Sequence, residues 1–315
     1  MSRLASAGTL WPEITVLERG WLSANSILFA APAGAAPAGA ALVDTGYCTH
    51  AEQTLALVHA ALDGQPLARI LNTHLHSDHC GGNAALQAAW PQVHTAIAPG
   101  QAVQVRDWDE HALGYIPTGQ QCPRFRVDAT LEPGSEVSLG GRPWQIHAAP
   151  GHDPHSVILF EPEARLLISA DALWEKGFGV VFPELDGEDA FAAVGATLDL
   201  IERLNPATII PGHGPVFHHL APALATARAR LDGFVQSPLR HARHAAKVLI
   251  KYKLLEWQQI DQDGLQAWFE TASTLVQLRT RHFSHAEPGA WLATMVDELV
   301  AAGAARREGE RIYNA

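Results

Sequence analysis

Short apolar runs, separated by Gly, Pro or polar residues, recur between residues 14 and 210 and predict β-strands. Segments with helix-forming composition lie between some of these runs, at 50–62, 83–89, 99–108 and 188–204. The predicted strands are 14–18, 25–30, 41–46, 68–71, 93–98, 136–139, 143–148, 157–160, 166–170 and 207–210. Because strands and helices alternate, the pattern predicts a layered α/β or α+β domain.

The pattern of predicted elements changes near Ser237. Helices are predicted at 245–255, 264–272 and 290–302, and residues 304–313 predict a hairpin that turns at Glu308 and Gly309. We therefore expect two parts. These are a domain over residues 1–235 and a small, mainly helical module over residues 236–315.

Three segments have no regular pattern. Residues 31–40 form an Ala/Pro/Gly run without bulky side chains, which we interpret as a mobile hairpin loop with no functional role. Residues 106–127 and 173–187 are long and carry aromatic side chains such as Trp108 and Trp174. Long irregular loops in compact domains are often lids or binding loops, so we expect both segments to border a substrate pocket.

Side chains that can bind a metal are most concentrated in residues 72–82, where three histidines and one aspartate fall within six positions. In an extended segment His74 and His76 point to the same side, whereas Asp78 and His79 follow after the chain has turned. Imidazole and carboxylate groups together suit a borderline divalent metal such as zinc. The alternative is a chance cluster on a polar loop, in a chain that has 17 histidines.

Residues 73–79, THLHSDH, resemble the T-H-x-H-x-D-H signature of the metallo-β-lactamase superfamily. Counterparts of the family's other ligands follow in the family's order. His152 comes after a Pro-Gly, Asp171 comes after an apolar strand, and His213 lies in a Gly-His-Gly turn. The resemblance covers roughly residues 13–220 and fills all seven ligand positions. It implies the family's four-layer αβ/βα sandwich, with each ligand just past a strand end.

The same resemblance implies a site for two divalent metal ions, which we expect to be Zn²⁺, with iron or manganese as alternatives. Two metals about 3.5–4 Å apart can share a hydroxide, which then attacks an electrophilic carbonyl or phosphorus. Asp78 and Asp171 are also the residues that we expect to be catalytic. The expected division is His74, His76 and His152 for one ion, Asp78, His79 and His213 for the other, and Asp171 as a bridge between them.

The aspartate at position 171 favours some reaction classes of the superfamily over others. The best-known class of true β-lactamases in the superfamily has cysteine there, whereas glyoxalase-II-like thioesterases, lactonases, phosphodiesterases and nucleases have aspartate. We therefore expect a dinuclear metal-dependent hydrolase of small thioesters, lactones or esters, without β-lactamase activity. One alternative is a metal-dependent phosphodiesterase or endoribonuclease that binds RNA through residues 236–315. Another is a metal-stabilised binding or regulatory protein without enzymatic activity.

The C-terminal module, with helices followed by a hairpin, resembles the winged-helix appendage of lactamase-β-like endoribonucleases. The RNA alternative needs a basic groove that continues into the metal site. The second interpretation of the module is a helical cap on the main domain or a dimer contact. The only basic cluster of the module consists of Arg240, Arg243, Lys247, Lys251 and Lys253.

Charge and cysteine content limit the expected partners. Residues 1–235 hold 12 Lys and Arg against 24 Asp and Glu, within a formal net charge of -11, so nonspecific binding to nucleic acid is not favoured. Three cysteines without C-x-x-C spacing argue against a disulfide framework and fit a reducing cytosol. With no signal peptide or membrane span in view, we expect a cytoplasmic protein that acts on a small molecule, and a homodimer is left open.

Three residues near the motifs have two interpretations each. Asp44, at the end of a predicted strand, either orients a metal ligand or is a simple turn aspartate. Cys80, directly after His79, is either a thiol that supports the site or a small buried filler. His155 stands where the family has a small residue, and it either approaches the substrate or is packed elsewhere.

Overall fold

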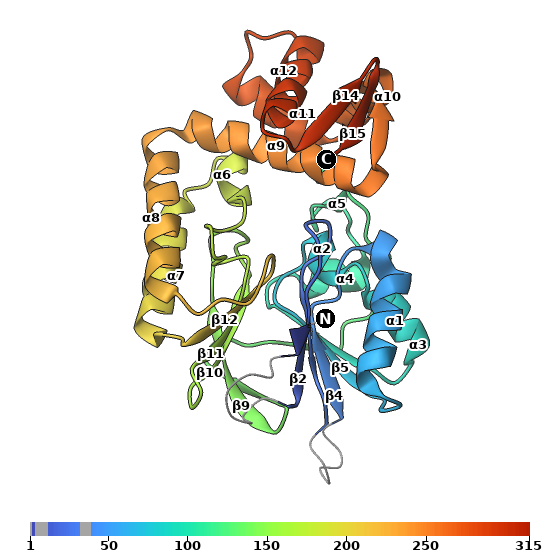
Figure 1. The fold of residues 1–315 in the computed structure, drawn as a ribbon, viewed down its shortest axis with the longest axis vertical. Helices are drawn as coiled ribbons and strands as arrows, with labels where there is room; N and C mark the ends of the chain where they lie inside the picture. Colours follow the sequence, from blue (N-terminus) through green and yellow to red (C-terminus); the bar gives the residue numbers. More distant parts are fainter. Residues whose placement is uncertain (1, 4–11, 32–38) are drawn as a thin grey trace.

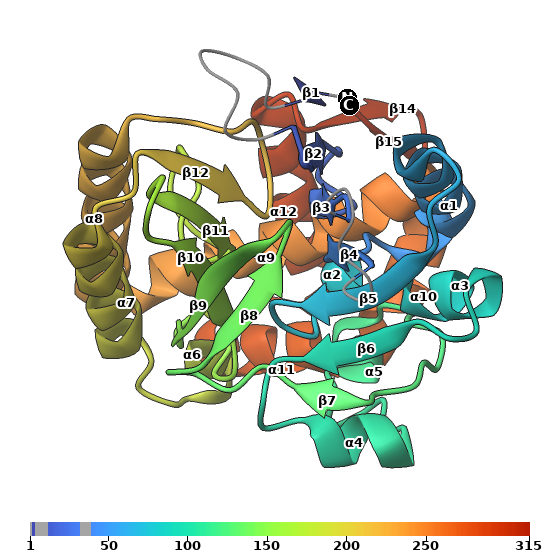
Figure 2. The ribbon, with the colours of Figure 1, turned by 90° about the horizontal axis from the view of Figure 1, so that it is seen from below.

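The computed structural model describes residues 2–3, 12–31 and 39–315, and two facing β-sheets form its main body (Figure 1). Two helices cover the outer face of each sheet, so the main body has four layers (Figure 2). This arrangement is the one that the family resemblance implies. The apolar side chains between the two sheets are fully buried, as Val43 in the first sheet and Leu159 in the second illustrate.

The first sheet has seven strands in the order β1-β2-β3-β4-β5-β6-β7. The pairs from β1 to β4 are antiparallel, and those from β4 to β7 are parallel. Helices α1 (Ala51–Leu62) and α3 (Asn83–Ala89) cover its outer face, where Val58 and Leu86 pack against Ile70. The strands are β1 (Ser2–Arg3), β2 (Ile14–Leu17), β3 (Ser26–Phe29), β4 (Ala40–Val43), β5 (Leu67–Asn72), β6 (His94–Ile97) and β7 (Ala129–Thr130).

The second sheet has five strands in the order β12-β11-β10-β9-β8. Only the β11–β12 pair is parallel. Helices α7 (Phe191–Leu204) and α8 (Leu220–Gln236) cover its outer face, where Leu198 packs with Leu167. The strands are β8 (Glu136–Leu139), β9 (Arg142–Ala148), β10 (Val157–Glu161), β11 (Leu166–Ala170) and β12 (Thr208–Pro211).

The C-terminal part begins with α9 (Pro238–Trp257), which runs across the top of both halves of the sandwich (Figure 1). The hydrophobic core of the C-terminal part also includes Val180 and Leu185 of the main body. The two parts therefore share buried apolar surface. The hairpin predicted at the end is confirmed, and it forms a three-stranded sheet in the order β13-β15-β14. The remaining elements are β13 (Gln259–Asp261), α10 (Gln262–Thr271), α11 (Ser273–His282), α12 (Pro288–Ala301), β14 (Ala305–Glu308) and β15 (Arg311–Asn314). The boundary at residue 235 and the winged-helix resemblance stay predictions.

Several elements differ from the sequence expectations. The segments predicted to be irregular contain the short helices α5 (Tyr115–Thr118) and α6 (Phe182–Asp186), which are too short to produce a helical period in the sequence. Helices α8 and α11 were not predicted at all. Of the loop predicted at 31–40, residues 32–38 lie outside the described part. The other short elements are a 3₁₀ turn at Cys48–His50, α2 (Ser77–Cys80) and α4 (Ala102–Asp107).

Within residues 12–31 and 39–315, no helix combines the length and the apolar character that crossing a bilayer would require.

Candidate metal centre

All seven predicted ligand residues meet at one edge of the two sheets, each just past a strand or on a short helix. His74 and His76 follow β5, and Asp171 directly follows β11. Chain segments that are far apart in sequence thus deliver side chains to one place, as the strand-end rule predicts. The potential donor atoms form three groups, within each of which they lie no more than 4.8 Å apart: His74, His76 and His152; His74, His79 and Asp171; and Asp78, His79 and His213.

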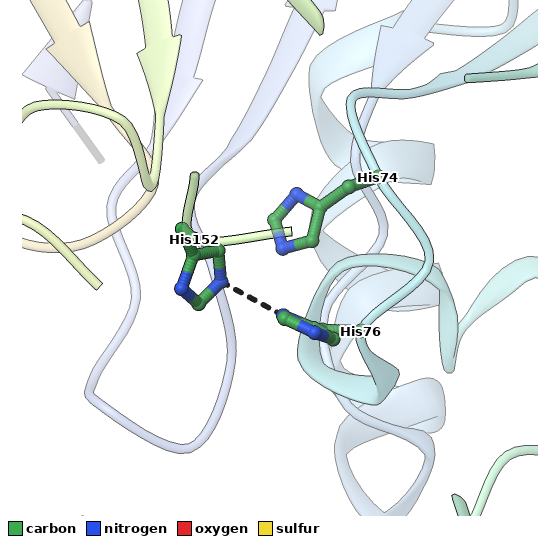
Figure 3. A group of neighbouring side chains, drawn as sticks. All are labelled: His74, His76 and His152. Carbon is green, nitrogen blue, oxygen red and sulfur yellow. Dashed lines mark hydrogen bonds between the residues drawn. The ribbon is translucent and has the colours of Figure 1, made fainter. Parts of the chain in front are cut away.

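The first group is a triangle of imidazole rings (Figure 3). His76 Nδ1 lies 2.8 Å from His152 Nε2, and the His74 ring centroid lies 4.7 Å from that of His76 and 5.1 Å from that of His152. His152 Nδ1 lies 2.5 Å from the carbonyl oxygen of Val180, to which it donates its proton. The Nε2 atom of His152 therefore keeps a lone pair that faces the other two rings.

His79 in the second group is oriented by Asp44. The Oδ2 atom of Asp44 lies 2.8 Å from His79 Nδ1, and the carboxylate also accepts hydrogen bonds from the backbone N–H and the hydroxyl of Thr73. Asp44 occupies a left-handed backbone conformation (φ +56°), which few residues other than Gly, Asn and Asp adopt. These contacts support the interpretation of Asp44 as a ligand-orienting carboxylate rather than a simple turn residue.

Asp171, a member of the second group, lies between His152 of the first group and His79, which the second and third groups share. Its Oδ2 atom is 3.3 Å from His152 Nε2, while its Oδ1 atom is 3.4 Å from His79 Nε2. The indole N–H of Trp174 donates to Oδ1 over 3.1 Å. A carboxylate with one oxygen towards each of these histidines has the geometry that a bridging ligand needs. Gly212 makes room for it, because a Cβ atom at this position would lie 2.2 Å from Asp171 Oδ1.

Three buried nitrogens of the cluster, His74 Nε2, His79 Nε2 and His213 Nδ1, have no hydrogen-bond partner among the described residues. Burying a polar atom without a partner is costly, so such atoms usually belong to a site that binds something. Neutral imidazoles and carboxylates are the donors that zinc, iron and manganese take in proteins. The residues therefore fit a pair of divalent cations.

The protonation states of His74, His76 and Asp171 agree with this fit. Burial, helped by the neighbouring rings, lowers the pKa of His74 well below its usual value, and burial together with His152 lowers the pKa of His76 to about 4. Burial opposes ionisation of Asp171, but His79 and His213 outweigh it and hold the pKa of that carboxyl well below its ordinary range. Neutral histidines and an ionised aspartate are the forms that bind a metal. His79 differs, because burial opposes its protonation but Asp171 and Asp44 outweigh burial and raise the pKa of that ring well above its usual value, so a cation bound there would displace a proton from His79.

A cavity of about 1230 Å³ opens onto the cluster. Both segments that were expected to border a pocket line it, through Tyr115 and Pro117 in the first and Trp174 and Phe182 in the second. Helix α9 lines it as well. Both segments therefore border a cavity at the cluster, and its role as the substrate pocket stays a prediction.

Two aromatic residues at this site were not predicted from the sequence. Trp21, between β2 and β3, is 56% exposed and stacks on His213, with ring centroids 5.4 Å apart and an interplanar angle of 9°. Tyr252 of α9 lines the cavity, and its hydroxyl lies 3.3 Å from Ser77 Oγ. A Gly-Trp pair between two predicted strands was the only local signal for Trp21. Tyr252 had none, because it reaches the site only through the folded position of α9.

The structure also separates the two interpretations of Cys80 and His155. Cys80 is fully buried, with its sulfur 3.2 Å from the hydroxyl of Tyr115 and 3.8 Å from Cys122 Sγ, so it is a packed filler. His155 packs against Gly100, where an added Cβ would lie 2.3 Å from its Nδ1 atom. His155 is not among the residues that line the cavity.

The basic cluster of the module does not form one continuous face. The ammonium of Lys253 is buried and lies 2.5 Å from Glu256 Oε2, and that of Lys251 donates to Asn314 and to two backbone carbonyls. The other three members, Arg240, Arg243 and Lys247, line a smaller pocket between α8 and the N-terminal half of α9.

Comparisons with known proteins agree with the geometry. A family model described as the metallo-β-lactamase superfamily matches residues 19–213. A hydroxyacylglutathione hydrolase from Anaeromyxobacter dehalogenans (strain 2CP-C) is 36% identical over 204 residues, which make up 62% of this chain and 68% of that protein. The acyl-coenzyme A thioesterase MBLAC2 of Homo sapiens is 26% identical over 157 residues, which make up 46% of this chain and 55% of that protein.

Among solved structures, a metallo-β-lactamase family protein from Thermus thermophilus superposes with a TM-score of 0.58 at 18% identity. The match covers 97% of this chain and 100% of that one, so the shared fold extends into the C-terminal module. The predicted fold is confirmed, and the expectation of a hydrolase is confirmed at the level of the family, because the similar proteins are named as hydrolases. The chain belongs to the metallo-β-lactamase superfamily.

Proposed function

We propose that the chain is a metal-dependent hydrolase whose substrates are small thioesters, with lactones and other esters as the wider class. The observation that carries the proposal is the convergence of seven potential metal ligands, five of which line a large cavity with aromatic walls, namely His76, Asp78, His152, Asp171 and His213. The names of two similar proteins, a hydroxyacylglutathione hydrolase and an acyl-coenzyme A thioesterase, support a thioester in particular.

In this proposal His74, His76 and His152 hold one divalent ion, Asp78, His79 and His213 hold the other, and Asp171 contacts both. Bound there, the two ions would supply a water-derived nucleophile at neutral pH and would stabilise negative charge that develops on the substrate oxygen. Asp44 and the Val180 carbonyl keep His79 and His152 in the orientation that presents Nε2.

The side chains that line the cavity position the acyl group of the substrate. Trp21 and Trp174 both pack against His213, so an apolar acyl chain can lie on indole surface beside the ligands. Hydrolysis adds water across the acyl C–S bond. The oxygen joins the acyl carbon, and the sulfur leaves as a thiol.

The test is a hydrolysis panel on metal-loaded protein, with an acyl thioester, a lactone, an aryl ester, an activated phosphodiester and a short RNA. We expect turnover of the thioester, and we expect His76→Ala to abolish it. The matched control is His155→Ala, which removes a nearby histidine that does not line the cavity. Cleavage of the phosphodiester or the RNA without thioester turnover would contradict the proposal and favour the endoribonuclease alternative.

A further inference from the structure

A second, smaller cavity of about 460 Å³ lies in the corner between α8 and α9. Four of its lining side chains are cationic, namely Arg230, Arg240, Arg243 and Lys247, and its described lining includes no carboxylate. An acidic group outside this lining, Glu298 of α12, pairs with both Arg243 and Lys247. One carboxylate against four cations leaves the corner strongly positive in a chain whose formal net charge is -11.

Burial and the neighbouring like charges shift the pKa values of two residues that line this pocket. Burial and then Arg230, Lys247 and Arg240 lower the pKa of His244, which sits among them, to about 4. Burial and then Arg240 lower the pKa of Arg230. A folded protein that gathers cations without matching anions loses stability, which is typical of a site that an anionic ligand completes.

The corner pocket adjoins the cavity at the metal centre. Arg230, His244 and Lys247 line both cavities. Phe182 and Val248 line the larger cavity as well, so an apolar section lies in the same space as the metal centre and the shared cationic residues. Together these features can accommodate an extended substrate, with its reactive group at the metal centre and a charged end in the corner.

Arg230 also connects the pocket to the ligand-supporting loop, which is residues 171–181 between β11 and α6. Its guanidinium donates to the carbonyls of Lys176 and Phe178. The same loop contains Val180, whose carbonyl accepts from His152, and Trp174, whose indole donates to Asp171. An anion bound at Arg230 would therefore touch the residue that holds this loop in place.

We propose that the corner pocket lined by Arg230, Arg240, Arg243 and Lys247 binds the phosphate groups of the thiol carrier of the substrate. This inference rests on the proposed thioester hydrolysis and adds the class of carrier. Arginine presents a planar fork that matches phosphate oxygens, and three arginines with one lysine suit a group with several negative charges. A phosphate carries about -1.5 to -2 at neutral pH, against -1 for a carboxylate, and so offsets this cluster better.

Binding is tested without catalysis, by calorimetric titration with adenosine 3′,5′-bisphosphate, which has phosphates but neither thiol nor acyl group. We expect saturable binding to the wild type, a loss of at least about tenfold in affinity for Arg240→Glu, and a smaller loss for Arg240→Gln. Arg311→Glu, a charge reversal at an exposed residue of β15, should bind like the wild type. Equal affinities for wild type and Arg240→Glu, or a loss caused by His76→Ala instead, would overturn the proposal.

Specificity is tested by kinetics with one acyl group on three carriers: coenzyme A, glutathione and the uncharged N-acetylcysteamine. We expect Arg240→Glu to lower the ratio of kcat/KM for the coenzyme A thioester to that for the uncharged thioester by at least about tenfold, with no such fall for Arg311→Glu. An equal fall for the glutathione thioester would overturn phosphate as the recognised group. If the wild type hydrolyses none of the three, the proposed function fails, while the titration still decides on the pocket.

Discussion

The backbone N–H of Val181 donates a hydrogen bond to His241 Nε2 over 3.2 Å, and so connects the ligand-supporting loop to α9. The preceding carbonyl, that of Val180, accepts from His152. To accept from Val181, the His241 ring must be unprotonated at Nε2. The orientation of a proposed metal ligand therefore depends on a neutral histidine in the C-terminal module.

The first prediction concerns the pH dependence of stability. Burial, and then His244 and His282, lower the pKa of His241 to about 4, whereas a histidine in an unfolded chain titrates near 6.5. Between these two values the unfolded state binds more protons, so stability is lost as the pH falls. Near pH 4 the histidine is fully protonated in the unfolded state, and the loss in the free energy of unfolding is then on the order of 3 kcal/mol.

Urea unfolding of the wild type and of His241→Gln, at neutral pH and about two units below, measures this loss. We expect the free energy of unfolding to fall less in the variant than in the wild type. His285→Gln, which removes an exposed histidine, should behave as the wild type does. A variant with the full wild-type fall would show that His241 does not contribute to the acid sensitivity.

The second prediction concerns Asp171. Because its two oxygens face the two ligand groups, we expect Asp171→Ala to bind no more than one metal equivalent tightly, where the wild type binds two. The metal content per chain after dialysis, measured by mass spectrometry, gives the answer. Asp186→Ala, at another carboxylate on the same cavity, is the control and should retain two. Two tight equivalents in Asp171→Ala would contradict the bridging role.

The third prediction concerns the residue that orients His79. Asp44→Asn keeps the size of the side chain and tolerates the left-handed backbone, but it replaces a charged acceptor of the His79 proton with a neutral amide. Loss of such a partner typically costs about 10–100-fold in metal affinity, which chelator competition measures. Asp128→Asn, where the carboxylate accepts from the Thr95 backbone in the first sheet, should leave the affinity unchanged.

The fourth prediction concerns Gly212. In Gly212→Ala the new methyl group would lie 2.2 Å from Asp171 Oδ1, so the carboxylate or the His213 turn must move. A displacement of about 1 Å at a reacting centre can cost about 100-fold in rate, and we expect a loss of that size in kcat/KM. Gly195→Ala in α7 meets its nearest neighbour at 3.7 Å and should keep full activity. Equal activities for the two variants would show that the turn yields easily.

The seven candidate ligand residues, which the structure brings together, could be predicted from sequence because each belongs to a local pattern that matches the resembling family. Residues 73–79 carry four of them in one stretch, and the others sit beside short glycine or strand signals. The strands of the main body could be predicted from mostly apolar runs such as 157–160 and 166–170, which are buried strands. Their arrangement in four layers was implied by the family resemblance, because the pattern of strands and helices alone indicates only an α/β or α+β domain.

What the sequence did not predict depends on contacts between distant segments. Tyr252 meets Ser77, and His241 meets Val181, only because α9 crosses both halves of the sandwich. Helix α11 was missed because only Leu275 and Leu278 of its ten residues are buried, which is too few to produce an apolar stripe. The corner pocket likewise draws Arg230 from α8, a helix that was not predicted, next to residues of α9.

The position of α9 across the site also has a consequence for synthesis on the ribosome. The chain emerges from its N-terminus, and domains generally fold in that order. All seven proposed ligands precede Pro238, so they leave the ribosome before the helix that roofs them. A main domain that folded at this stage would present the seven side chains to solvent before α9 lines the cavity beside them.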